Sequence, residues 1–444
     1  LSIRRQRQMC IRDSIDTKLL FVYLLLVLIG MSAVFSVEYR ATDVSIFLMS
    51  KSHMKQAIWL GVSLFVGLII LFTESKFFAS FAYLGYALGL SLLVITIFLG
   101  KDVKGSHSWL GIGSFAFQPG EVCKIFTALA MAKFLSSPET NFNTWKHRII
   151  GIGLALFPAM LIILQKETGL ALVYFSFFLV MYREGLPISI LVIGFSLIVL
   201  TITTLLLSSI AMFILLTLLA SLVAYLSWRD IKRNVTARGL LIGIWAVCIL
   251  FSQFIVPITF KKVLQGYQID RIYSMLGQDV PDKYRKDAED AHGAKKGNAS
   301  DYNVTQSKIA IGSGGFWGKG FLNGTQTKND FVPEQHTDFI FCAIGEQYGF
   351  VGSCILIGLY IYLMLRIIII GERQRSAFSR IYAYGVAAIL FFHFAINISM
   401  TIGLAPVIGI TLPFLSYGGS SLLSFSVLIF ILMRLDADRQ VLIR

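Results

Sequence analysis

Ionisable residues stand at the ends of long apolar runs in this sequence, where a charge is costly and therefore suggests function. Glu121 and Lys124 are three residues apart, so they share a helical face and can form an ion pair. Asp338 opens another apolar run, and His393 and Asn397 are four residues apart within a third. Acids and cations gathered at one membrane surface suit the processing of the polar head of an amphiphilic substrate.

Each of these residues also has a simpler interpretation. Glu121 and Lys124 could be an interfacial ion pair that caps a helix, and Asp338 could favour the positive end of a helix dipole. His393 could be a packed, hydrogen-bonded residue of the interior. The segment 165–169, with the sequence QKETG, could be an ordinary polar turn. Spacing alone does not decide between these interpretations and a substrate site.

The elements that must position these residues are membrane-spanning helices. Of the 444 residues, 56% are hydrophobic and only 14% are charged, whereas soluble domains average about 25% charged residues. The apolar runs have lengths that suit a hydrocarbon core about 30 Å thick. We predict an all-α polytopic membrane protein with about twelve transmembrane helices, near 18–37, 56–73, 81–99, 118–135, 149–164, 169–182, 187–207, 211–227, 239–257, 338–370, 381–403 and 420–434.

The chain divides into four segments. Residues 1–14 resemble a translated sequencing adapter and are interpreted as a non-native leader. N-terminal transmembrane helices occupy 15–257, a large loop occupies 258–337, and C-terminal transmembrane helices occupy 338–444. The five cysteines form no CxxC pair, so neither a disulfide framework nor a zinc site is indicated.

Loop charge predicts the orientation. With a cytoplasmic N-terminus, the inner loops hold more Lys and Arg than the short outer loops, which places both termini in the cytoplasm and the large loop outside. The net charge of +14 then reflects cytoplasmic loops rather than nucleic-acid binding. The segment 403–419 contains Pro406 and Pro413, and such irregular backbone at membrane depth must line a cavity. If the polar stretches converge, they form one cleft at the outer leaflet; these stretches are 101–124, 165–169, 302–346 and 397–421.

Two long stretches resemble the shape, elongation, division and sporulation (SEDS) family. They are Tyr302–Gly352, which contains GTQT and PEQHTDFIF, and Ile410–Leu423, with the sequence ITLPFLSYGGSSLL. Trp109 and the segment QPGE at 118–121 match further landmarks of the family. The residues of the first stretch are more similar to those of elongation-type members such as RodA than to those of division-type members such as FtsW.

This resemblance implies a fold of ten transmembrane helices, to which a hairpin at 187–227 would add two. It implies a glycosyltransferase that polymerises lipid II into β-1,4 glycan at the outer face of the bacterial plasma membrane during cell elongation. The implied partners are a class B penicillin-binding protein, which is a transpeptidase, and other membrane proteins of the elongation complex. The implied cofactor is a divalent cation, Mg²⁺ or Mn²⁺.

The resemblance also implies roles for residues. The family aspartate that corresponds to Asp338 is regarded as the catalytic acid/base, and a carboxylate there could take the proton of an attacking sugar hydroxyl. Lys124, held by Glu121, or a metal ion could stabilise the departing pyrophosphate. The candidate substrate-binding residues are Trp109, Gln118, Glu121, Lys124, Glu167, His336, Thr337, Asn397, Ser416 and Ser420.

This sequence departs from the family pattern at several positions. Ser108 occupies the place of the arginine that usually precedes the motif tryptophan, and Gly120 replaces a serine. Gln165-Lys166-Glu167 stands where the family usually has Gln-Pro-Asp. Three alternatives stay open: a lipid II flippase, a solute transporter and a division-type paralogue. The confinement of ionisable residues to one end of the helices favours outer-leaflet chemistry over transport.

Overall fold

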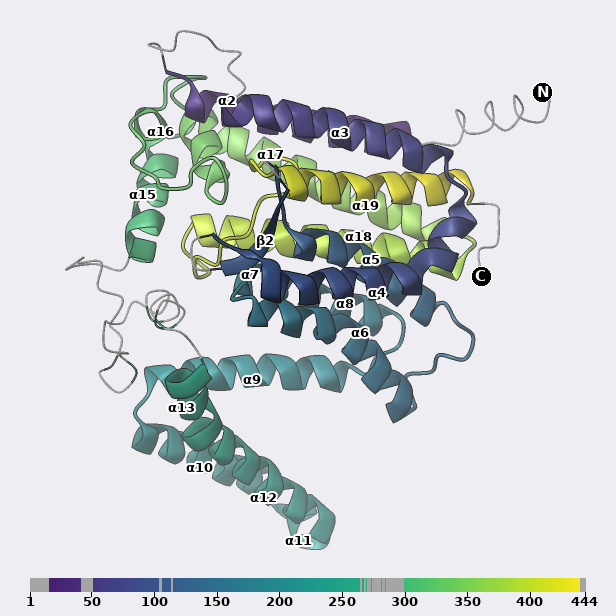
Figure 1. Ribbon diagram of the computed structural model, residues 1–444. Helices are drawn as coiled ribbons and strands as arrows, with labels where there is room; N and C mark the ends of the chain where they lie inside the picture. Colours follow the sequence, from purple (N-terminus) through teal and green to yellow (C-terminus); the bar gives the residue numbers. More distant parts are fainter. Residues whose placement is uncertain are drawn as a thin grey trace. The chain divides into compact units, whose positions relative to one another are not determined.

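The computed structural model describes residues 16–40, 51–103, 106–112, 115–263 and 299–439, together with positions 266, 269, 273, 281 and 284. The predicted leader at 1–14 lies outside these residues. The predicted helical membrane fold is confirmed (Figure 1). Within the described residues, ten helices are long and apolar enough to cross a membrane: α2 (Thr17–Glu38), α3 (Ser52–Phe72), α4 (Ser75–Leu99), α6 (Trp145–Leu164), α9 (Ile188–Leu206), α10 (Ser209–Leu226), the run Val235–Lys262 that begins with α12 (Val235–Leu250), α17 (Ile340–Glu372), α18 (Ala377–Thr401) and α19 (Gly419–Ala437).

The twelve predicted apolar runs all fall on helices, but two of those helices are short. Helix α5 (Pro119–Leu135) has 17 residues. The run Thr168–Arg183 consists of α7 (Thr168–Val173) and α8 (Phe177–Arg183), joined by a 3₁₀ turn. The predicted number of twelve transmembrane helices is therefore not confirmed, because length and composition support ten.

The chain forms two compact units. One contains residues 1–186 and 302–444, and the other contains residues 187–301. The predicted hairpin at 187–227 belongs to the second unit, where it forms α9 and α10. In that unit α10 lies against α12, and a small buried cluster includes Leu205, Val256 and Phe260. Most other side chains of these helices are apolar and exposed, as expected for surfaces that face lipid.

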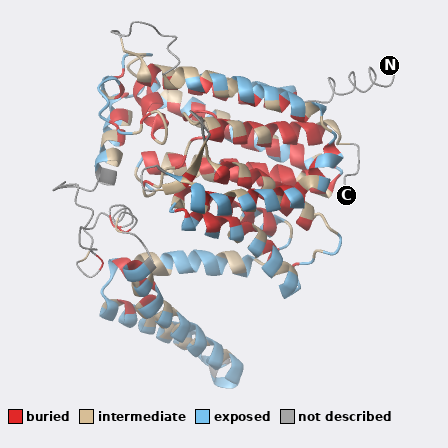
Figure 2. Cartoon of the chain, viewed as in Figure 1, coloured by how far each residue is buried: buried red, intermediate tan, exposed pale blue. Residues whose placement is uncertain are grey.

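The core of the first unit is built from α5, α18 and α19. Figure 2 shows that buried residues dominate these helices, whereas α3 and α4 carry many exposed apolar residues. Helix α19 packs against α3, α4 packs against α5, and α17 packs against α18. A helix that is apolar all round and enclosed by other helices can carry inward polar groups only where they find partners.

Helix α17 is bent at Gly349. This residue has φ of +63°, inside a helix of 33 residues that is longer than the roughly 20 residues needed for one span. The backbone of Gly315 accepts a hydrogen bond of 2.9 Å from the N–H of Phe350, just after the bend. The first turns of α17 are thereby attached to the segment 314–320.

A small antiparallel sheet follows α4. Its strands are β1 (Lys101–Val103), β2 (Ser106–Ile112) and β3 (Phe115–Phe117), with β2 in the centre. Trp109 of β2 is opposite Lys101 of β1. The sequence does not predict this sheet, because two of the strands have only three residues and contain no clear alternation.

Acidic and basic side chains join the beginning of α2 to the ends of α17 and α19. Asp16 caps α2 by accepting the N–H of Leu19 and forms ion pairs of 2.6 Å with Arg366 and 3.0 Å with Arg373. Arg373 also pairs with Asp436 of α19. Burial acts to raise the pKa of the Asp16 carboxyl, but Arg366 and the Leu19 N–H hold that pKa below its usual value.

We expect Asp16→Asn to lower the free energy of unfolding by about 2–4 kcal/mol at pH 7, because it leaves two partly buried guanidinium groups without this carboxylate. A lowered folded-state pKa gives stability that is present above the unfolded pKa of about 3.9 and is lost as the pH falls through the folded value. The difference in the free energy of unfolding between Asp16→Asn and the wild type should therefore become smaller in acid. Thermal unfolding in detergent, with Glu74→Gln as an exposed control, measures it; a constant difference down to acidic pH would contradict this assignment.

Candidate functional site

Asp338 lies in the turn that precedes α17. The helix begins at Ile340 with Phe339 as its N-cap, two residues later than predicted, so Asp338 lies outside the first helical turn. Its side chain is half-buried. Asn397 of α18 donates one amide hydrogen to the backbone oxygen of Asp338 at 2.8 Å and the other to that of Ile410 at 2.6 Å. This fully buried amide joins the Asp338 turn to the irregular loop 403–418.

The irregular loop lies directly against the Asp338 carboxylate. Gly409 has φ of +80°, and a Cβ added there would lie 3.3 Å from Asp338 Oδ2. On the other side, a Cβ added at Gly169 would lie only 2.8 Å from the backbone oxygen of Ile408. The loop is therefore enclosed between the Asp338 turn and the segment 165–169. The predicted convergence of these polar stretches is confirmed.

The β2 strand joins the same region through Glu167. Oε2 of Glu167 accepts hydrogen bonds from the hydroxyl groups of Ser106 at 2.8 Å and Ser108 at 2.9 Å. The backbone N–H of His107 donates to the Gln165 oxygen at 3.1 Å. Ser108, which stands at the position where the family pattern has an arginine, thus binds this acid through its hydroxyl. Glu167 anchors the strand that carries Trp109, and its contact with substrate stays a prediction.

Lys124 lies at the centre of a buried polar cluster. Its ammonium is 2.6 Å from Glu121 Oε2 and 3.4 Å from His393 Nε2, and it lies over the ring of Phe425. Ser424 of α19 donates to the same Glu121 oxygen at 3.1 Å. The Thr411 carbonyl, 3.2 Å from His393 Nδ1, can only accept, so Nδ1 carries the proton and Nε2 can accept from Lys124. The cluster connects α5, α18 and α19 to the irregular loop.

This enclosure limits what Lys124 can do. The side chain has no exposed surface, and Glu121 is only 4% exposed. A buried charge is stable only when it is paired, and here a carboxylate, an imidazole and an aromatic face surround it. The structure thus favours a structural role for the pair, and direct contact between Lys124 and a phosphate stays a prediction. Gln118 is the half-buried N-cap residue of α5 and makes no side-chain cap.

Glu346 holds the large loop in place. This fully buried carboxylate accepts hydrogen bonds from Lys319 Nζ at 2.8 Å, from the Gln326 N–H at 2.8 Å and from the Thr327 N–H at 2.9 Å. The backbone oxygen of Thr327 in turn accepts from Gln335 Nε2 at 2.9 Å. Glu346 therefore supports the segment that leads to Asp338 without facing Asp338 itself.

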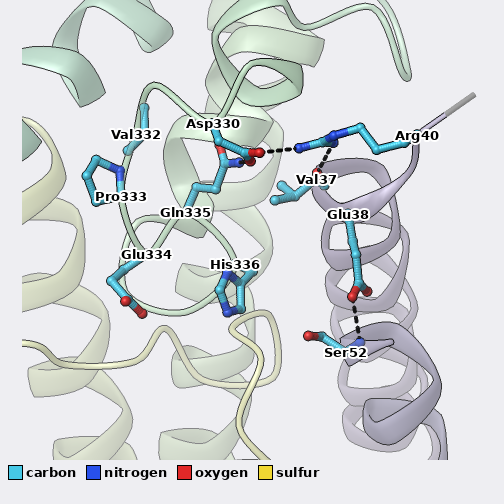
Figure 3. Close-up of a pocket in the computed structure, with 10 residues that line it drawn as sticks. All are labelled: Val37, Glu38, Arg40, Ser52, Asp330, Val332, Pro333, Glu334, Gln335 and His336. Atoms are coloured by element: carbon cyan, nitrogen blue, oxygen red, sulfur yellow. Dashed lines mark hydrogen bonds and ion pairs between the residues drawn. The ribbon is translucent and has the colours of Figure 1, made fainter. Parts of the chain in front are cut away.

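A cavity of about 350 Å³ opens beside that segment (Figure 3). It lies between the end of α2, the start of α3 and the loop 330–336, and Asp338 is not one of its lining residues. The residues that line it are Val37, Glu38, Arg40, Ser52, Asp330, Val332, Pro333, Glu334, Gln335 and His336. His336, a predicted substrate-binding residue, thus faces an open cavity. Thr337 donates its hydroxyl to Glu334 Oε2 at 3.1 Å.

The remaining candidates occupy supporting positions. The backbone oxygen of His336 accepts from the Tyr417 N–H at 2.8 Å, and Ser416 Oγ accepts from the Leu412 N–H at 2.8 Å. Ser420 is buried in the first turn of α19. These contacts give shape to the irregular loop, and substrate contacts of Ser416 and Ser420 stay predictions.

Sequence reasoning missed Lys308, an exposed residue of α15 (Ala299–Ser313). Its ammonium lies against Gly403, the first residue of the irregular loop. The preceding residue, Ser307, donates to the backbone oxygen of Thr401 at 2.9 Å, which joins α15 to α18. Buried Ser307 and Ala310 are three residues apart on this helix, and Lys308 lies outside their face. This amphipathic spacing could have suggested the placement.

The described residues do not fit a resident metal ion. They contain no group of three or more His, Cys, Asp or Glu side chains arranged to hold one. The predicted divalent cation therefore has no ligand set among these residues, and no chemical step is assigned to it. Mg²⁺ commonly binds through substrate phosphates with one or two carboxylates, which leaves a cation carried by the substrate as a proposal.

Known proteins that resemble this chain belong to one family. The model of the FtsW/RodA/SpoVE cell cycle protein family matches residues 16–234 and 213–441. Peptidoglycan glycosyltransferase RodA of Treponema pallidum is 30% identical, over 95% of this chain and 97% of its own length. Peptidoglycan glycosyltransferase MrdB of Escherichia coli K12 is 33% identical, over 80% of this chain and 78% of its own. A probable peptidoglycan glycosyltransferase FtsW of Buchnera aphidicola (subsp. Baizongia pistaciae) is 28% identical, over 95% of this chain and 94% of its own length.

Solved structures share the fold. A chain from a structure described as the structural coordination of polymerization and crosslinking by a peptidoglycan synthase complex has a TM-score of 0.64 and 24% identity, and the match covers 96% of this chain and 98% of that one. The rod shape determining protein RodA of Thermus thermophilus has a TM-score of 0.59 and 23% identity, with the same coverage. At these identities the likeness supports the fold alone.

The buried pair of Glu121 and Lys124 can be tested by a double-mutant cycle. We expect Lys124→Met to destabilise the protein by about 3–5 kcal/mol, because it leaves a buried carboxylate without its cation. Adding Glu121→Gln should recover most of that loss, since both charges are then removed. Thermal unfolding in detergent gives the values, with Lys133→Met in the last turn of the same helix as control. A double variant as unstable as the single one would contradict the pairing.

Proposed function

The chain belongs to the FtsW/RodA/SpoVE family of cell cycle proteins, and from this premise we propose that it is a peptidoglycan glycosyltransferase. Its substrate would be lipid II, a disaccharide-peptide carried on a lipid pyrophosphate, and its product β-1,4 glycan. The observation that carries the proposal is the half-buried Asp338, held at the end of a membrane helix with its carboxylate against Gly409 of the irregular loop.

The proposed step is a direct displacement. A sugar hydroxyl attacks the anomeric carbon of the neighbouring lipid-linked sugar, and the carbon–oxygen bond to the pyrophosphate breaks with inversion. Asp338 takes the hydroxyl proton as the new glycosidic bond forms, which a carboxylate within hydrogen-bond reach can do. The Asn397 amide keeps the backbone of Asp338 fixed against the loop, so the carboxylate needs little reorganisation.

The departing pyrophosphate develops negative charge that an exposed cation can stabilise. Lys308 suits this role better than Lys124, because its side chain is exposed beside Gly403 whereas Lys124 is enclosed. The buried cluster around Lys124 would instead hold the irregular loop through His393 and Thr411. A divalent cation, Mg²⁺ or Mn²⁺, would accompany the pyrophosphate.

The setting of the reaction follows from the helices. The chain is a multi-pass membrane protein, since ten described helices can span a bilayer. We propose that it lies in the bacterial plasma membrane with both termini in the cytoplasm, as the charge of the loops indicates. The Asp338 turn and the cavity would then face outward, where the lipid-linked disaccharide is polymerised.

We further propose an elongation role with a transpeptidase partner of the class B penicillin-binding protein type, within the elongation complex. The support is the residue sequence of the segment 302–352 and the 33% identity to MrdB of Escherichia coli K12, compared with 28% and 30% to two FtsW proteins of Buchnera aphidicola. One structural relative comes from a peptidoglycan synthase complex that coordinates polymerization and crosslinking, which supports a crosslinking partner. A division role is the alternative.

Asp338→Asn should reduce glycan synthesis at least about 100-fold, because general base catalysis contributes roughly 10² to 10⁴ in rate. The variant keeps the side-chain volume and the backbone oxygen that Asn397 binds, so its unfolding temperature should stay close to wild type. The assay uses purified protein with its transpeptidase partner, labelled lipid II, and gel separation of the glycan strands.

The control for this assay is Glu139→Gln, which removes an exposed carboxylate from the loop between α5 and α6. It should leave synthesis unchanged. Full activity of Asp338→Asn would refute the base assignment. Movement of lipid II across the bilayer by the wild type, without any polymer, would instead support a flippase.

A further inference from the structure

The cavity beside the Asp338 turn is negatively charged. Its lining includes the carboxylates of Glu38, Asp330 and Glu334, but only one guanidinium, that of Arg40 (Figure 3). Arg40 is paired with Asp330 at 2.7 Å. Glu38 accepts the N–H of Ser52 at 2.8 Å, and its other carboxylate oxygen lies 2.8 Å from His53 Nδ1. The lining therefore has more carboxylates than cations, which favours a positively charged occupant.

Gln335 supplies an independent sign of a ligand. Its side chain is only 3% exposed and lies among the residues that line the cavity. Nε2 donates to the Thr327 backbone oxygen at 2.9 Å and to Asp330 Oδ1 at 2.8 Å. Both partners can only accept, so the orientation of the amide is fixed. Oε1 is left without a donor among the described residues, although a buried acceptor normally has one.

The missing partner must therefore be a hydrogen-bond donor. An ammonium group offers three donors, no acceptor and a positive charge, which matches both the orphaned amide oxygen and the excess of carboxylates. A metal ion fits less well, because the described residues contain no cluster of ligands suited to one. A cavity of about 350 Å³ is at the small end of ligand sites and has room for an amine-bearing side chain with part of its peptide.

The backbone around the cavity is held in an uncommon shape. Asp330 and Glu334 both have φ of +55°, in the left-handed region that non-glycine residues seldom adopt. The ends of this loop are fixed by Gln335 at one side and by the Arg40–Asp330 pair at the other. The carboxylates are thus presented by a preformed loop whose chain reaches Asp338 four residues after Glu334.

We propose that this cavity binds the free amino group of the peptide carried by the peptidoglycan precursor, with Glu334, Asp330 and Gln335 as its recognition residues. The proposal rests on the proposed function, because that function supplies a substrate with an amine-bearing peptide. His336 lines the cavity and Asp338 follows two residues later in the chain, so a peptide held here would lie beside the segment that carries the catalytic carboxylate. The site would favour precursors whose amine is not yet modified.

The test measures peptide binding separately from polymerisation. The probe is a lysine-containing stem pentapeptide, labelled with a fluorophore at its N-terminus so that only the side-chain amine is free. Its Nε-acetylated twin is the matched ligand. Full-length protein in lipid nanodiscs is titrated with each peptide, and fluorescence anisotropy gives the two dissociation constants.

We expect the free-amine peptide to bind about tenfold more tightly than the acetylated one, as one charge-assisted hydrogen bond would provide. Glu334→Gln keeps the side-chain shape and should reduce this ratio to below about threefold. Asp330→Asn is the second variant if Glu334→Gln does not fold. Glu139→Gln, on a distant exposed loop, should keep the wild-type ratio.

Equal affinity of the wild type for the two peptides would overturn the proposal. So would displacement of both peptides by Mg²⁺ together with Mg²⁺ binding that Glu334→Gln abolishes, since the cavity would then be a cation site. The glycan synthesis assay is run in parallel. An amine preference without any polymerisation would refute the proposed function alone, and polymerisation without an amine preference would refute this inference alone.

Discussion

The site depends on one buried amide. Asn397 uses both of its amide hydrogens to bind backbone oxygens, one in the Asp338 turn and one in the irregular loop 403–418. Backbone groups that lie outside regular helices and are removed from solvent need such partners, because a buried polar group without a hydrogen bond is costly. The same two hydrogen bonds therefore solve a folding problem and fix the position of the candidate catalytic carboxylate. Replacing Asn397 would therefore disturb both the irregular loop and the Asp338 turn.

Two further polar networks support this contact from opposite sides. Glu346 fixes the large loop and, through Thr327 and Gln335, the segment that leads to Asp338. The cluster of Glu121, Lys124 and His393 fixes the irregular loop through Thr411. Each charge in these networks is paired, as a low-dielectric surrounding requires. The chain thus uses its few buried ionisable residues mainly to hold irregular backbone, and leaves Asp338 and Lys308 more exposed.

The sequence predicts the helices and the candidate residues well, for physical reasons. Apolar runs of bilayer length have few alternatives to a membrane helix, and residues such as Asp338 and Asn397 stand out because polar groups are rare there. The converging stretches 165–169 and 397–421 could also be anticipated from their polarity. The resemblance in 302–352 and 410–423 then identifies the family, which the comparisons confirm.

Other features required the folded chain. The bend at Gly349 lies inside a continuous apolar run, so hydropathy gives no sign of it. Glu346 binds Lys319, 27 residues away, and no helical spacing relates them. The partner of Lys124 on α18, His393, is 269 residues distant in sequence. Spacing predicted the Glu121–Lys124 pair but not its nearly complete burial, which favours a structural role for the pair.

The central claim is that Asp338 accepts the proton of the attacking sugar hydroxyl. It is tested most directly by an experimental structure of the Asp338→Asn variant with two bound lipid II molecules, because that variant should hold substrate without turning it over. We expect a sugar hydroxyl about 2.6–3.2 Å from the substituted side chain and facing an anomeric carbon. A complex in which both sugars lie beyond reach of residue 338, or on the opposite side of the membrane, would contradict the claim.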